Sequence, residues 1–70
     1  MQSARPFKAK LRLKQPDPNG RLRTVWGSHE ERIFTSYAEM EAHAETMLRG
    51  APSGTRVYDA YGALIAKKGA

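Results

Sequence analysis

Four basic residues alternate with apolar residues near the start of the chain. The basic residues are Lys8, Lys10, Arg12 and Lys14, and the apolar ones are Phe7, Ala9, Leu11 and Leu13. A period of two is typical of a strand with one buried face, so the basic side chains should form a row with spacings of about 6.6 to 6.8 Å. Such a row can bind the phosphates of nucleic acid or an acidic protein surface. The alternative is a solvated face on which Lys and Arg discourage association between sheets.

The positive charge of the chain is concentrated in its first third. The chain has 12 Lys and Arg against 7 Asp and Glu, a net charge of +5, and residues 1–23 contribute seven basic residues and only one acidic residue. Arg21 and Arg23 extend the predicted basic surface on a neighbouring strand, although the face that each occupies depends on the strand register. The charge balance favours nucleic acid or an acidic protein surface as the partner. We expect nucleic acid or a nucleoprotein complex, with an acidic protein surface as the alternative.

Other residues that could do chemistry do not converge on a site. His29 and His43 lack the additional ligands of a metal centre. Ser28, His29 and Glu30 have the residue types of a nucleophilic triad, but neighbours in an extended segment point to opposite faces. The chain has no cysteine, which removes disulfides and thiolate metal sites. We expect no enzyme activity, no metal and no cofactor.

Three aromatic residues could add stacking surfaces to the basic row. These are Trp26, Tyr58 and Tyr61, and sheet platforms that bind single strands use such rings. With few large apolar residues available, we expect Trp26 and Tyr58 to lie in the core or at its edge. Tyr61 should lie at a turn.

The elements that position the basic row begin with a hairpin. Residues 15–20 contain two prolines and an Asn-Gly pair, which predict a hairpin loop after the first strand. A second strand should run from Arg21 to Trp26 and resume over Glu31 to Thr35. Gly27 and Ser28 interrupt it as a bulge, or else form a second tight hairpin that divides it into two strands.

A helix is predicted from Tyr37 to Arg49. Ser36 and Glu39 have the spacing of a capping box, and Gly50 stops the helix. Its apolar stripe comprises Tyr37, Met40, Ala44, Met47 and Leu48. The residues expected to point away from the sheet are Glu39, Glu41, His43, Glu45 and Thr46.

The remaining residues complete a sheet. Residues 55–59 have strand composition, a turn follows, and residues 63–66 can pair back. The fold class is therefore α+β, with an antiparallel three- to four-stranded sheet, one helix packed on one face, and the order β-β-α-β(-β). A short helical connection should place the third strand beside the first. The first strand is then central, with the basic row in the middle of the open face.

The length and the termini suggest one small domain over residues 1–70. Residues 1–6 should be a flexible segment and residues 67–70 a basic tail. No stretch has the length of a signal peptide or a membrane span, so we expect a cytoplasmic protein with no membrane partner. An unprotected sheet edge leaves both a monomer and a homodimer open.

The arrangement as a whole resembles compact phage and mobile-element proteins, including anti-CRISPR inhibitors and small inhibitors of host RNA polymerase. The resemblance lies in the basic hairpin, the helix entry over residues 34–41 and the segment 56–62. A second similarity, carried by Gly20-Arg21 and residues 34–36, is to the arm-binding domains of tyrosine recombinases, although here strand sequence continues after the helix. The resemblance implies a non-enzymatic inhibitor, such as an anti-CRISPR protein, whose basic sheet face engages nucleic acid or a nucleoprotein complex. A protein-docking inhibitor or assembly factor without affinity for free nucleic acid is the alternative.

Overall fold

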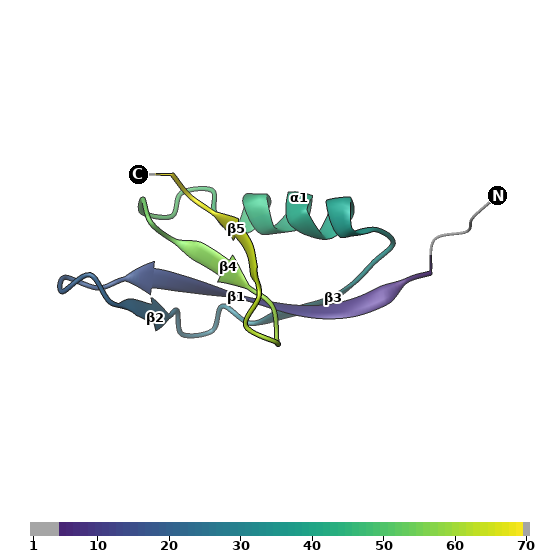
Figure 1. Cartoon of the computed structure of the whole chain (residues 1–70), viewed down its shortest axis with the longest axis horizontal. Helices are drawn as coiled ribbons and strands as arrows, with labels where there is room; N and C mark the ends of the chain where they lie inside the picture. Colours follow the sequence, from purple (N-terminus) through teal and green to yellow (C-terminus); the bar gives the residue numbers. More distant parts are fainter. Residues whose placement is uncertain (1–4, 70) are drawn as a thin grey trace.

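The computed structural model describes residues 5–69 and consists of a twisted antiparallel sheet and one helix (Figure 1). The elements are β1 (Phe7–Pro16), β2 (Leu22–Thr24), β3 (Glu30–Phe34), α1 (Tyr37–Met47), β4 (Arg56–Tyr58) and β5 (Leu64–Lys67). The predicted α+β class and the antiparallel pairing are confirmed. The sheet has 5 strands, one more than the upper number predicted, because the second predicted strand is divided into β2 and β3.

The long strand β1 is the centre of the sheet, as predicted. The strand order is β2-β1-β4-β5, and β3 also pairs with β1. Along one edge of β1, β3 pairs with residues 7–11 and β2 with residues 14–16, whereas β4 pairs with residues 12–14 on the other edge. The half of β1 nearest its start therefore has no strand on its β4 side among the described residues.

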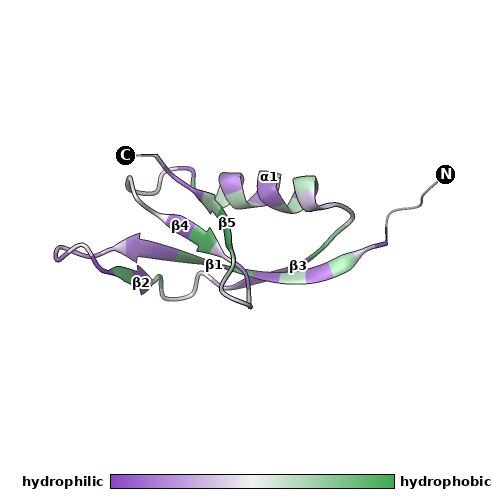
Figure 2. Cartoon of the chain, in the orientation of Figure 1, coloured by the Kyte–Doolittle hydropathy of each residue, from purple (hydrophilic) through white to green (hydrophobic). Residues whose placement is uncertain are grey.

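The hydrophobic core lies between the sheet and α1. Its buried residues are Leu11, Phe34, Met40, Ala44, Leu48, Val57 and Ile65, and Ala9, Leu13, Met47 and Ala66 pack against them. The odd-numbered residues of β1 thus face the helix, as the period of two predicts, and Figure 2 shows the resulting alternation of hydropathy along the strand. Phe7, at the start of the strand, contacts Phe34 with a centroid separation of 6.1 Å and remains partly exposed.

The break between β2 and β3 is a loop along the edge of β1 rather than a hairpin. Both strands pair with β1 in the same antiparallel sense. The N–H of Val25 donates to the carbonyl of Leu13 at 2.9 Å, and the N–H of Leu13 donates to the hydroxyl of Ser28 at 3.1 Å. The Ser28 side chain replaces a backbone acceptor where the ladder is interrupted, and Gly27 makes the bend with a φ of 76°.

The helix begins as predicted and ends two residues early. The Ser36 hydroxyl accepts the Glu39 N–H at 3.1 Å, and the Glu39 carboxylate reaches back to the N–H and hydroxyl of Thr35. Regular α-helix ends at Met47. The expectation that Tyr37 belongs to the buried stripe is wrong, because its side chain is 55% exposed.

The two predicted terminal segments have different outcomes. Residues 1–4 of the expected flexible segment and residue 70 of the expected basic tail lie outside the described residues. The expectation that the tail begins at residue 67 is wrong, because Lys67 is the last residue of β5 and pairs with Arg56. Lys68 is also held, since its N–H donates to the Thr55 carbonyl at 2.8 Å and its ammonium to the Leu48 carbonyl at 3.3 Å.

Candidate nucleic-acid interface

The predicted basic row lies on the sheet face away from the helix. In antiparallel sheets, directly paired residues share a face. The register pairs Lys8 with Ile33, Lys10 with Glu31, Arg12 with Tyr58 and Lys14 with Arg56. Lys8 and Lys10 are exposed, whereas Arg12 and Lys14 are half-buried between their neighbours. The structure therefore brings together the four predicted residues of β1.

Two further cations join this row from the neighbouring strands. Arg56 lies opposite Lys14, and Lys67 of β5 lies opposite Arg56. We call the open basic face the surface formed by Lys8, Lys10, Arg12, Lys14, Arg56 and Lys67. Sequence reasoning missed Arg56, although a buried Val57 would have placed Arg56 and Tyr58 together on the opposite face.

Tyr58 lies among the cations of the open basic face. Its direct partner is Arg12, the Lys14 ammonium lies 5.2 Å from its ring centroid, and the Arg56 guanidinium donates to its hydroxyl at 3.4 Å. The ring thus separates like charges and interacts favourably with the Lys14 cation. Tyr58 is half-buried and belongs to the open face instead of the core.

No carboxylate forms an ion pair with the open basic face within the described residues. The ion pairs of residues 5–69 are Arg23–Asp17, Arg32–Glu30 and His43–Glu30. Glu31 lies opposite Lys10 by register but makes no such contact. The buried Nε of Arg12 has no hydrogen-bond partner among residues 5–69. The positive charge of this face is therefore available to an anionic partner.

Arg21 and Arg23 are both predicted to extend the basic row, but they do not both lie on the open basic face. Arg23 lies opposite Gln15, which places it on the other face, and its Nε contacts the Asp17 carboxylate at 2.9 Å. Arg21 lies in the hairpin loop, where its N–H donates to Asp17 at 2.8 Å. This hydrogen bond is the main reason that the pKa of Asp17 lies below its ordinary value of 3.8.

The three aromatic residues considered for stacking lie outside the core. The expectation that Trp26 is buried is wrong, because it lies in the loop between β2 and β3 and is 99% exposed. Tyr61 lies at the β4–β5 turn, as predicted, and is 95% exposed. No pattern in the sequence distinguishes an exposed Trp26 from a buried one, because its exposure follows from the interruption of the ladder.

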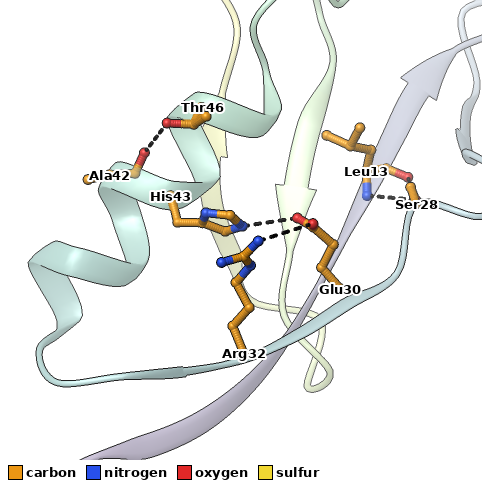
Figure 3. A network of polar contacts seen from close by, with 7 residues as sticks. All are labelled: Leu13, Ser28, Glu30, Arg32, Ala42, His43 and Thr46. Carbon is orange, nitrogen blue, oxygen red and sulfur yellow. Dashed lines mark hydrogen bonds and ion pairs between the residues drawn. The ribbon is translucent and has the colours of Figure 1, made fainter.

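His43 connects the helix to the sheet on the opposite side of the molecule. Its Nε2 lies 3.0 Å from the Glu30 carboxylate (Figure 3). The His43 ring also packs against that of Phe34, with a centroid separation of 5.7 Å. The expectation that His43 points away from the sheet is wrong. Within residues 5–69, no three His, Cys, Asp or Glu residues are grouped so that they could hold a metal ion, and no helix is long and apolar enough to cross a membrane.

Comparison with protein-family models, with curated proteins and with solved structures found no match for this chain.

Proposed function

We propose that the protein binds nucleic acid through the open basic face without catalysing a reaction. The observation that carries the proposal is the collection of six cationic side chains on one side of β1, β4 and β5, with no carboxylate paired to them in the described residues. Like charges placed this close repel one another and lower stability. A bound polyanion removes that repulsion.

Binding would be driven mainly by the release of counterions from the phosphates. A protein that neutralises about four to six phosphates gives a slope of log affinity against log salt of roughly −3.5 to −5.5 on duplex DNA. Contacts of this kind position the protein on the backbone and carry little sequence information. The half-buried Arg12 and Lys14 lie at the centre of the face, where partial desolvation strengthens a contact with phosphate.

The test is fluorescence anisotropy with labelled duplex DNA and labelled single-stranded RNA at about 50 and 200 mM salt, the range over which counterion release is measurable. We expect micromolar or tighter binding with the steep salt dependence given above. Absence of binding to both probes at the lower salt concentration would overturn the proposal. It would leave the open basic face as a docking surface for an acidic protein.

For the biological use of this surface, we propose that binding obstructs a nucleoprotein machine, as the resemblance to small phage inhibitors suggests. The tagged protein would be recovered from a bacterial lysate with and without nuclease. A partner complex that is lost after nuclease treatment supports recruitment through nucleic acid. A partner that survives nuclease and moderate salt would instead favour direct docking on protein.

A further inference from the structure

Two aromatic rings, on loops at opposite edges of β1, stand almost fully in solvent. Trp26 is 99% exposed and Tyr61 is 95% exposed, although the buried core contains only one aromatic residue, Phe34. Burial of a large ring contributes strongly to stability. Two exposed rings in a chain this small therefore indicate a role in binding rather than in stabilising the fold.

Both rings are carried by loops that hydrogen bonds hold in place. The Trp26 loop is fixed to β1 by the contacts of Val25 and Ser28 with Leu13, and the Ser28 N–H also donates to the Val25 carbonyl at 3.2 Å. At the other loop, the Asp59 carboxylate accepts the N–H groups of Tyr61 and Ala63, each at 2.9 Å. Loops fixed in this way lose little further entropy when a ligand binds.

The two loops flank β1 from its opposite edges. The Trp26 loop bonds to Leu13 on the edge occupied by β2 and β3, whereas the Tyr61 turn follows β4 on the other edge. In Figure 1 both loops extend away from α1. The basic row of β1 therefore runs between the two loops that carry the rings.

Tyr61 also borders a hollow at the start of the row. This hollow has a volume of about 360 Å³ and is lined by Phe7, Lys8, Ala9, Lys10, Ala60 and Tyr61, together with the carboxylates Glu31 and Asp59. The N–H and C=O groups of Lys8 and Lys10 point toward this edge, because those of Leu13 point toward the opposite one and the direction alternates along a strand. The hollow thus combines the Tyr61 ring, two cations and polar backbone groups with two carboxylates, of which Asp59 already accepts two N–H groups of its own turn.

A single-stranded nucleic acid matches this combination better than a duplex does. Its bases can separate and stack on aromatic side chains while its phosphates follow a positively charged groove. In a duplex the base faces are covered by their neighbours, so exposed rings gain nothing from stacking. Every base has a stackable face, so recognition of this type tolerates sequence variation.

We propose that the preferred ligand is a single-stranded nucleic acid whose bases stack on Trp26 and Tyr61 while its phosphates contact the open basic face. This inference rests on the proposed function and adds the class of nucleic acid.

The experiment uses the fluorescence of Trp26, the only tryptophan in the chain. A 12-nucleotide single strand and the matching duplex are titrated at the same salt concentration. We expect the single strand to bind at least about tenfold more tightly and to quench the tryptophan emission. Trp26→Ala and Tyr61→Ala should each weaken single-strand binding by about tenfold to a hundredfold, as measured by anisotropy, and should leave duplex binding unchanged.

Control variants separate stacking from folding and from general charge. Trp26→Phe should recover much of the lost affinity, and Tyr37→Ala, which removes an exposed ring on the helix, should have no effect. If the Trp26 and Tyr61 variants bind the single strand as tightly as the unmodified protein, the stacking proposal is overturned and binding to phosphate alone remains. If neither nucleic acid binds, the proposed function fails as well.

Discussion

The two faces of β1 are built from alternating residues and have different surroundings. Leu11 is 1% exposed in the core, whereas Lys10 and Arg12 beside it belong to the open basic face. On the helix side, the charges have local partners, as in the contact of His43 with Glu30. On the open side, cations gather without carboxylate partners in the described residues. The difference implies that stability and binding can be changed independently by mutating neighbouring residues of one strand.

The largest expected effect is on the core face. Leu11→Ala should cost about 2 to 5 kcal/mol, and the core of a chain this small rarely supplies more than about 3 to 5 kcal/mol. We therefore expect the variant to be largely unfolded at room temperature in far-ultraviolet circular dichroism. Lys10→Ala is the matched control and should melt like the unmodified protein. A cooperative melt of Leu11→Ala at the unmodified temperature would contradict the assignment of the core.

A smaller loss of stability is expected where the ladder is interrupted. Ser28→Ala removes the acceptor of the Leu13 N–H, and an unsatisfied, partly buried N–H costs about 1 kcal/mol or somewhat more. The midpoint of urea denaturation should fall, while Ser53→Ala, an exposed serine, should leave it unchanged. Equal midpoints for the two variants would show that the Ser28 hydroxyl does not hold the loop.

Two arginine variants, one on each face of the sheet, test which face binds nucleic acid. Arg56→Gln removes a cation from the open basic face and should reduce the salt slope on duplex DNA by about one. Arg23→Gln removes a cation that is paired with Asp17 on the other face and should leave the slope unchanged. Anisotropy at several salt concentrations measures both. A larger effect of the Arg23 variant would reverse the assignment of the two faces.

The smallest effect concerns pH and the hairpin loop. Hydrogen bonds from Arg21 and the other loop donors lower the pKa of Asp17 in the folded protein. The ionised carboxylate therefore stabilises the fold above its unfolded pKa, and this contribution is lost as the pH falls through the folded pKa. Between about pH 5 and pH 2, Asp17→Asn should lose less stability in urea denaturation than the unmodified protein. An identical loss in both would contradict this role of Asp17.

Much of the fold follows from local patterns in the sequence. The period of two in β1, the Asn-Gly loop and the Ser36 cap each depend on residues close together in the chain, and all three are confirmed. The division of β2 from β3 depends on a side chain, Ser28, that replaces a backbone acceptor. A pattern of residue types does not distinguish that arrangement from a bulge or a hairpin.

The candidate site was only partly predictable for a related reason. The four cations of β1 share a face because of local periodicity, whereas Arg56 and Lys67 join them through the pairing of strands distant in sequence. Arg23 is directed to the other face by the register of the hairpin. The positions of Trp26 and His43 likewise depend on tertiary packing, which overrides the expectation from residue type and helical spacing.

The open basic face, and not the net charge of the protein as a whole, is what we propose binds nucleic acid. Lys10→Glu with Arg12→Glu and Arg32→Glu with Arg49→Glu each lower the net charge from +5 to +1, but only the first pair lies on the open basic face. Lys8→Glu with Lys10→Glu, both exposed, replaces the first pair if Arg12→Glu does not fold.

The most direct measurement is the anisotropy of these charge-matched variants with one labelled nucleic acid at about 50 mM salt, after circular dichroism has shown that each is folded. We predict that the open-face variant loses more than about tenfold in affinity and that the control pair stays within about threefold of the unmodified protein. Equal losses in the two folded variants would contradict the account, because net charge alone would then explain the binding.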